Sequence, residues 1–307
     1  MKKGFTNTKK RSKQRTLTLF LMSLPGILKV FIFAYIPMIG IIIAFQDYNP
    51  MDMFFSPWNN FNNFKFFFKS VDFGRIMFNT IFMNCIFIIV GTVVALALAL
   101  LLFEVAHTKI AKLSQVSFFI PYFVSYVVVS ILVSGFLDSK GILTTLIYNL
   151  TGKTIRFYME ASYWRYILVF VHVWKSAGVT GIIYYTTLLN VDPSLYEAAA
   201  IDGATRWQRV FVISLYELKS MIVVLALMSF ANILRSDFNL FFYVTGNSAA
   251  LYSTVDVIDT YIYRSIKQST NFGLASAVSF VQAVAGLILT VLINALAKKI
   301  DDSVSLF

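Results

Sequence analysis

Cysteine and histidine are scarce in this 307-residue sequence. It holds one cysteine, Cys85, and two histidines, His107 and His172. A disulfide within the chain is therefore excluded, and the thiol, which lies in an apolar run, is expected to pack against neighbouring side chains. A metal cluster needs several such ligands at short spacing, so we predict no metal site.

The sequence also lacks the motifs with which enzymes bind phosphate or activate a nucleophile. The nearest match to a phosphate-binding loop is Gly152-Lys153-Thr154, but position 147, where that loop needs its first glycine, is Ile147. We find no serine elbow and no pair of carboxylates at a useful spacing. We therefore expect this chain not to be an enzyme and to bind no cofactor of its own.

Charged residues make up only 13% of the chain, whereas hydrophobic residues make up 58% and the mean hydropathy is +0.73. This composition is far from that of soluble proteins and indicates an integral membrane protein. The apolar runs use most of the residues and leave no stretch long enough for a separate globular domain. We predict one all-α membrane domain.

Six apolar runs are long enough to be transmembrane helices, because roughly 20 residues at 1.5 Å per residue cross a hydrocarbon core of about 30 Å. They fall at 17–45, 78–103, 114–137, 163–189, 218–234 and 274–297. The fifth run is the shortest, and its helix can begin earlier, around Phe211. Pro121 lies inside the third run and is expected to kink it, since proline lacks the amide hydrogen that the helix needs.

The net charge of +11 is concentrated at the N-terminus. Seven of the 26 lysines and arginines precede Leu17, namely Lys2, Lys3, Lys9, Lys10, Arg11, Lys13 and Arg15. Such a tail is typical of a segment kept in the cytoplasm and does not require nucleic acid as a partner. With six spans, both termini are then cytoplasmic. We expect a basic tail at 1–16, a membrane domain at 17–297 and a second cytoplasmic tail at 298–307. The first span is too long for a cleaved signal peptide.

The last long loop contains a second kind of helical pattern. Between Tyr252 and Lys267, apolar residues recur at Val255, Ile258, Ile262 and Ile266. This spacing predicts one amphipathic helix that lies on the outer surface of the membrane domain.

The stretch 192–216 is too polar for the membrane and lies between the fourth and fifth spans, on the predicted cytoplasmic side. Asp192 suits a helix N-cap, and Pro193 suits the first helical position. We expect a short helix up to position 202, a turn at Gly203, and a second helix over 204–216. A helix of this kind at a membrane surface usually contacts another protein.

This stretch resembles the EAA signature of ABC-importer permeases. The signature reads Glu-Ala-Ala, three residues, Gly, nine residues, Ile, one residue and Leu-Pro. Here it begins at Glu197, continues through Gly203 and Ile213, and departs at Tyr216, where the family usually has proline. Four further stretches are similar to the polysaccharide and oligosaccharide branch of the carbohydrate-uptake permeases, at 37–49, 174–176, 256–263 and 294–299.

The resemblance implies one permease half of a type I importer, with a carbohydrate as substrate. The expected partners are a second homologous permease, two nucleotide-binding subunits that hold ATP and Mg²⁺, an extracellular solute-binding protein and the lipid bilayer. The residues that the resemblance assigns to ATPase coupling are Glu197, Ala198, Ala199, Ala200, Asp202, Gly203, Arg206 and Ile213. Through them, closure of the ATPase subunits would shift the permease between inward-open and outward-open states.

Polar residues within the predicted spans are candidates for the substrate path, because they are costly in lipid and usually face a cavity or each other. Amides, hydroxyls and aromatic rings together suit a neutral glycan. The candidates are Asn79, Asn84, Tyr122, Tyr126, His172, Asn232 and Gln282. For any one of them, a contact between helices or a place in the interfacial aromatic belt is the plainer alternative. Lys29 and Lys175 also lie in spans; for Lys175, snorkelling and pairing at a subunit interface both stay open.

Two other functions remain as alternatives. The first is a permease half for another solute, such as a peptide or a lipid-linked molecule, although a cationic substrate would call for more acidic residues in the spans. The second is a channel or secondary transporter that works alone. Such proteins commonly show repeated halves or charged relay residues and need no docking helix. An intramembrane enzyme is disfavoured for want of catalytic groups.

Overall fold

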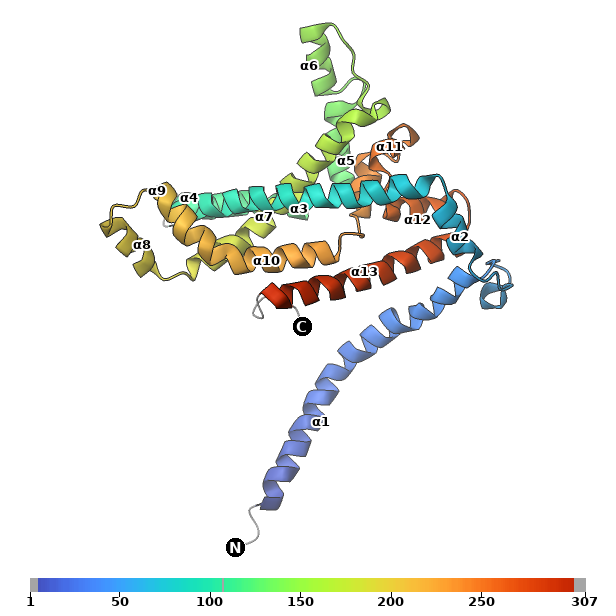
Figure 1. Cartoon of the computed structure of the whole chain (residues 1–307), viewed down its shortest axis with the longest axis horizontal. Coiled ribbons are helices and arrows are strands. Elements are labelled where there is room, and N and C mark those ends of the chain that lie inside the picture. The colour runs from blue at the N-terminus through green and yellow to red at the C-terminus, as the bar shows by residue number, and fades with distance from the viewer. Residues whose placement is uncertain (1–4, 107, 301–307) are drawn as a thin grey trace.

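A computed structural model describes residues 5–106 and 108–300, and these residues are mostly helical (Figure 1). The α-helices are α1 (Phe5–Val30), α2 (Asn62–Lys69), α3 (Asp72–Glu104), α4 (Lys109–Phe123), α5 (Tyr126–Leu137), α6 (Ile142–Thr151), α7 (Trp164–Leu189), α8 (Pro193–Ile201), α9 (Arg206–Arg209), α10 (Leu215–Ala231), α11 (Tyr252–Val255), α12 (Ile258–Lys267) and α13 (Phe272–Ile300). Shorter 3-10 and π-helical segments are Phe31–Tyr35, Ile36–Phe45, Met53–Phe55, Phe157–Met159, Ala161–Tyr163, Val210–Ser214, Leu240–Val244 and Ala249–Leu251. His107 and the outermost parts of the two predicted tails, 1–4 and 301–307, lie outside the described residues.

Six helical stretches in the described part of the chain are long and apolar enough to cross a membrane. They are Arg15–Phe45, Asp72–Glu104, Tyr126–Thr151, Ala161–Leu189, Arg206–Ala231 and Phe272–Lys299. The predicted all-α fold and the number of spans are confirmed. The fifth span starts earlier than its apolar run at 218–234, because α9, the π-helical turn Val210–Ser214 and α10 follow one another without a break. The second helix predicted over 204–216 is therefore the beginning of that span and does not end at Tyr216.

The third predicted span, 114–137, is two helices and not one kinked helix. α4 carries Pro121 in its last turn and ends at Phe123, and α5 begins after Ser125, whose Oγ accepts a hydrogen bond from the Val128 amide at 3.3 Å. A helix that stops leaves its last carbonyl groups without intrahelical partners. This break therefore needs hydrogen-bond donors from elsewhere in the molecule.

Lys175 of α7 supplies those donors. Its ammonium nitrogen donates to the carbonyl oxygens of Pro121 at 3.3 Å, Tyr122 at 2.9 Å and Val124 at 2.5 Å. It also lies 4.7 Å from the ring centre of Tyr126. Only 8% of the residue is exposed, so Lys175 neither snorkels to the surface nor reaches a subunit interface. It caps the broken helix within its own chain.

α3 and α7 form the centre of the bundle and lie side by side (Figure 1). Along their contact the buried residues include Phe87 and Leu168 in one apolar cluster and Ala99 and Tyr184 in another. α4 packs on α7 where Gly178 leaves room for it: a Cβ atom there would lie 1.8 Å from the Phe118 carbonyl oxygen. α8 and α12 lie at opposite ends of this bundle, which we call the α8 end and the α12 end.

α1 stands apart from the other helices (Figure 1). In the most apolar window of the first span, Arg15–Phe45, of which α1 is the first part, only 6% of the residues are buried within the chain. Met22 in α1 and Phe33 in the π-helical segment that follows it are each 75% exposed, and Lys29 is exposed as well. An apolar span of this kind must lie against lipid or against another protein.

The amphipathic helix predicted over 252–267 is interrupted in the structure. α11 ends at Val255 and α12 begins at Ile258, so the apolar repeat continues across a break at Asp256 and Val257. The prediction of one helix on the outer surface is wrong, because Val255 and Ile258 are buried in two different clusters and Asp256 is drawn inwards.

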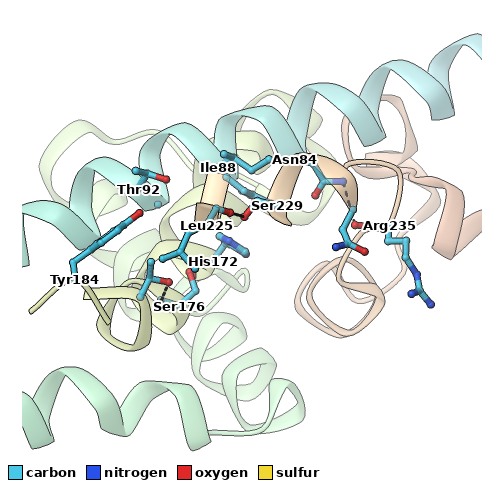
Figure 2. A pocket seen from close by; sticks show the side chains of 13 residues that line it. Asn84, Ile88, Thr92, His172, Ser176, Tyr184, Leu225, Ser229 and Arg235 are labelled. Atoms are coloured by element: carbon cyan, nitrogen blue, oxygen red, sulfur yellow. Dashed lines mark hydrogen bonds between the residues drawn. The ribbon is translucent and has the colours of Figure 1, made fainter. Parts of the chain in front are cut away.

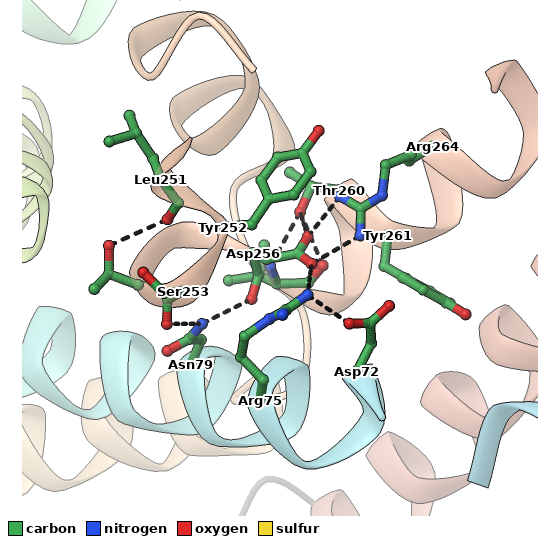
Figure 3. Close-up of polar contacts among 12 residues, drawn as sticks. Asp72, Arg75, Asn79, Leu251, Tyr252, Ser253, Asp256, Thr260, Tyr261 and Arg264 are labelled. Carbon is green, nitrogen blue, oxygen red and sulfur yellow. Dashed lines mark hydrogen bonds and ion pairs between the residues drawn. The ribbon is translucent and has the colours of Figure 1, made fainter. Parts of the chain in front are cut away.

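The Asp256 side chain is fully buried and fastens α12 to α3 (Figure 3). Its Oδ1 accepts from Thr260 Oγ1 at 3.1 Å and Arg264 Nη1 at 2.9 Å, and its Oδ2 accepts from Arg264 Nη2 at 2.7 Å and Arg75 Nη2 at 3.2 Å. Asn79 of α3 adds hydrogen bonds to the carbonyl oxygens of Ser253 and Asp256 at 3.3 and 3.2 Å. A carboxylate with four donors meets the condition under which a buried charge is tolerated.

Candidate functional site

The stretch 192–216, which we call the coupling segment, forms a hook at the α8 end of the bundle (Figure 1). Asp192 is the N-cap of α8: its Oδ1 accepts from the Ser194 amide at 2.9 Å, which lowers the pKa of this carboxyl. Pro193 is the first helical residue, as predicted. Gly203 then turns the chain with φ +78°, and Thr205 with Gln208 forms a capping box that starts α9.

The turn at Gly203 needs glycine because of its backbone conformation. It does not need glycine to make room for a neighbouring group. A Cβ atom at this position would meet nothing within 4 Å. A φ of +78° is nevertheless strained for residues with side chains, and most of all for β-branched ones. The sequence therefore predicts this turn correctly from one local property.

The residues assigned to coupling by the resemblance fall into two groups. Glu197, Ala198, Ala200 and Arg206 are exposed. The other four, Ala199, Asp202, Gly203 and Ile213, line one pocket of 330 Å³ between α8 and the start of the fifth span, and Asp202 and Gly203 are exposed as well. Glu197 also lines a second hollow, of 360 Å³, on the side of α8 that faces the end of α3. The segment thus presents an exposed surface with a hollow on either side of α8. Tyr216 is 70% exposed at the start of α10, where the helix continues.

Tyr196 was not singled out in the sequence, yet it ties α8 to two spans. Its ring centre lies 5.4 Å from that of Phe103 near the end of α3, and its hydroxyl lies 3.0 Å from Ser214 Oγ, which is 1% exposed. Among the described residues, the hydrogen bonds and ring contacts that join α8 side chains to other elements come from Tyr196. The available signal was a lone aromatic residue next to Glu197 in a helix of small and polar residues.

A first cavity, of 230 Å³, lies between α3, α7 and α10 (Figure 2). Its lining is mixed, with amide, hydroxyl, imidazole, aromatic and aliphatic groups. The lining residues are Asn84, Phe87, Ile88, Gly91, Thr92, His172, Ser176, Thr180, Tyr184, Leu225, Ser229, Asn232 and Arg235. The His172 ring stacks on Phe87 with 4.1 Å between centres and 9° between planes. Among the described residues His172 Nδ1 has no hydrogen-bond partner.

A second cavity, of 580 Å³, lies between α10, α12 and α13 and shares Asn232 and Arg235 with the first. Gln282 and Asp259 also line it. The two cavities therefore flank the same short piece of chain, which follows the end of α10.

That piece, residues 232–236, is held in place by side-chain amides from two other helices. Asn84 Nδ2 of α3 donates to the Ile233 carbonyl oxygen at 2.8 Å and to that of Arg235 at 3.4 Å. Gln282 Nε2 of α13 donates to the Leu234 carbonyl oxygen at 2.7 Å. Backbone that is neither helix nor strand needs such partners at membrane depth. We call 232–236 the inserted segment.

The predicted substrate-path residues thus separate by location. Asn84, His172 and Asn232 line the first cavity, and Asn232 and Gln282 line the second. Asn79 instead supports the Asp256 cluster, and Tyr122 and Tyr126 lie around Lys175. Sequence reasoning missed Arg235, Thr92 and Ser229. Arg235 was counted in an outer loop because it follows the fifth apolar run.

Six membrane-length helices, three of which enclose a polar cavity, are typical of a multi-pass membrane transport protein. The family model described as "Binding-protein-dependent transport system inner membrane component" matches residues 91–305. The chain belongs to this family, and it is a permease component in the membrane.

Two relatives from Bacillus subtilis (strain 168) are similar over most of the chain. The first, Protein LplB, is 35% identical over 94% of this chain and 91% of its own length. The second, "Polygalacturonan/rhamnogalacturonan transport system permease protein YteP", is 34% identical over 92% of this chain and 88% of its own length. A solved structure of "a bacterial ABC transporter involved in the import of the acidic polysaccharide alginate" matches with a TM-score of 0.85 and 31% identity, over 95% of this chain and 98% of that one. The type I importer permease architecture is thereby confirmed.

Proposed function

We propose that this chain is a permease half that imports oligosaccharides or fragments of polysaccharides, driven by ATP hydrolysis in separate subunits. The observation that carries the proposal is the first cavity, whose hydroxyl, amide and imidazole groups lie beside a stacked aromatic ring. Sugars offer hydroxyls for the first kind of group and an apolar ring face for the second. The polygalacturonan permease and the alginate importer, both similar over almost the whole chain, support this substrate class.

The coupling segment is the proposed contact with the ATPase subunits, which would hold ATP and Mg²⁺. Its exposed surface carries Glu197 and the small side chains of Ala198 and Ala200, so another protein can approach the α8 backbone closely. The α8 end then faces the cytoplasm, and both termini do so as well. In this proposal α8 moves as a rigid body and biases the equilibrium between inward-open and outward-open states.

The proposed assembly contains a second, homologous permease, two ATPase subunits and an extracellular solute-binding protein. The exposed apolar surface of α1 supports the second permease, because this helix finds few contacts within its own chain. A similar solved structure, 31% identical with a TM-score of 0.84, is described as an alginate transporter in complex with an "alginate pentasaccharide-bound periplasmic protein".

Co-purification and uptake test the proposal together. A tagged permease, extracted from its native membrane, is expected to bring down an ATPase, and cells are expected to take up labelled oligosaccharide only while ATP is available. A stand-alone channel or secondary transporter would bring down no ATPase and would continue to transport in ATP-depleted cells with an intact ion gradient. That result would refute the importer assignment.

Gly203 gives a sharper test of coupling. Gly203→Val forces a β-branched residue into a left-handed backbone and is expected to reduce ATP-driven uptake on the order of 10-fold. Gly203→Asn is the matched control, since asparagine tolerates this conformation and a Cβ atom here meets nothing within 4 Å. Membrane levels of both variants are measured by immunoblot. Equal uptake by the two variants would contradict a role for the turn.

A further inference from the structure

Arg235 belongs to the inserted segment, which side chains of two helices hold within the bundle. Asn84, which holds the inserted segment from α3, lies 12 residues beyond Asp72, or ~18 Å along the helix from the α12 end. Gln282, which holds it from α13, lies 10 residues beyond Phe272, or ~15 Å from the same end. Asn84 and Gln282 thus lie several turns inside two helices that are long enough to cross a membrane, so residues 233–235 lie within the bundle and not in a loop beyond it.

An arginine within the bundle needs either an ion pair or water. Among the described residues, no carboxylate oxygen lies within 4 Å of the Arg235 guanidinium, whereas Arg75 and Arg264 both have such partners. Asp259 is the acidic residue in the lining of the second cavity. The Arg235 charge acts on its carboxylate from beyond ion-pair distance, and the Asp259 oxygens accept hydrogen bonds from the Ser236 amide at 2.8 Å and from Gln282 at 3.3 Å. Arg235 is exposed and lies on the wall shared by both cavities, so water reaches it there.

The first cavity has no acidic residue in its lining, and Arg235 is its one charged side chain. Figure 2 shows Arg235 at one end of the lining residues, with its guanidinium directed away from Tyr184 and Ser176, which lie toward the other end. The cavity thus combines an aromatic stack, neutral polar groups and one cation. A glycan that enters the cavity displaces water from the guanidinium, and a carboxylate on that glycan would replace the water with a charged partner, which a neutral glycan cannot do.

We propose that Arg235 binds the carboxylate of an anionic sugar, and that the substrates of this permease are uronic-acid oligosaccharides. This inference rests on the proposed import of glycans and adds their charge. A guanidinium binds a carboxylate through two parallel hydrogen bonds, which an uncharged hydroxyl or ester cannot replace. Arg235 is therefore a specificity-determining residue. The polar residues found within the predicted spans favour a neutral glycan, but that set does not include Arg235.

The test compares acidic trisaccharides with their own methyl esters, which keep the sugar skeleton and remove the charge. The complete importer with its ATPase and solute-binding protein is reconstituted in proteoliposomes and given a panel of galacturonate, glucuronate, mannuronate and guluronate trimers. The measured quantity is the ratio of acid uptake to ester uptake. Because the same solute-binding protein delivers both forms to every variant, a change in this ratio between variants belongs to the permease.

Arg235→Gln is expected to lower the acid-to-ester ratio on the order of 10- to 100-fold, as for the loss of charge-assisted hydrogen bonds. Arg235→Lys is expected to fall between the native protein and the glutamine variant, because lysine keeps the charge but loses the paired geometry. Lys153→Gln, which removes an exposed charge outside the cavities, is expected to leave the ratio unchanged.

The possible failures are distinguishable. An importer that takes up neutral glycans in an ATP-dependent way and rejects the acids would overturn the role of Arg235 and leave the proposed function intact. The same holds if Arg235→Gln leaves the ratio unchanged. An importer that takes up no glycan of either kind would overturn the proposed function and, with it, this inference.

Discussion

The two ends of the bundle hold their helices by different means. At the α12 end, the buried Asp256 joins Arg75 of α3 to Arg264 of α12 through ion pairs of 3.2 and 2.7 Å. At the α8 end, α8 is largely exposed and is attached through Tyr196. The comparison indicates that buried ion pairs hold the α12 end in place, and we call this end the fixed frame. α8 at the other end has few such contacts and can move, and we call it the lever. The cavities lie between the two. Such an arrangement lets a movement of α8 change the cavities while the α12 end stays in place.

The largest expected effect comes from removing the fixed frame. Asp256→Ala leaves two arginines without their buried partner and is expected to lower the free energy of unfolding by about 3–5 kcal/mol. Thermal unfolding of the purified protein in detergent measures the change. Asp256→Asn keeps the shape and is expected to be less harmful, and Glu160→Ala, at an exposed position, is the control. Equal stability of the alanine variant and the control would show that the α12 end is not fastened by this cluster.

The next effect concerns the break in the third span, between the two ends. Lys175→Met removes the donor to three carbonyl groups and is expected to cost about 2–3 kcal/mol, since hydrogen bonds from a charged group are the stronger kind. Unfolding in detergent and proteolysis near residue 124 report on the loss. Lys29→Met changes the same side chain on exposed α1 and is expected to be neutral. If both variants behave alike, the break does not depend on Lys175.

The smallest effect tests the lever. Tyr196→Phe keeps the ring on Phe103 and removes the hydroxyl that meets Ser214, a loss of about 1 kcal/mol. We expect the number of ATP molecules hydrolysed per sugar imported to rise several-fold while the protein remains folded. Tyr216→Phe, at a position 70% exposed, is the matched control. An unchanged ratio of ATP to sugar would mean that α8 transmits its movement through the backbone alone.

The coupling segment could be predicted from the sequence because its signals are local. An N-cap at Asp192, a proline after it and a glycine that takes a positive φ each act within a few residues, and the structure has all three in place. The break at Pro121 was predicted only as a kink, because the donor that stabilises a complete break, Lys175, lies more than 50 residues away along the chain.

The cavity wall could not be predicted in the same way. Asn84 and Ile233 are separated by 149 positions, and Gln282 and Leu234 by 48, yet these contacts set the position of the inserted segment. A hydropathy window sees the end of an apolar run at 234 and assigns Arg235 to an outer loop. Contacts with helices far away in the sequence decide where Arg235 lies. Hydropathy along the chain therefore could not show that Arg235 lines the proposed substrate path.

The separated position of α1 has a consequence for the cell. In the proposed assembly, a newly made subunit would expose this apolar helix to lipid until the second permease covered it, and the uncovered span would mark a subunit that has not been assembled. The amount of importer would then follow the scarcer of the two permeases, and surplus copies of this chain would be short-lived. Matched synthesis of the two halves, and not the strength of either promoter alone, would set the capacity for uptake.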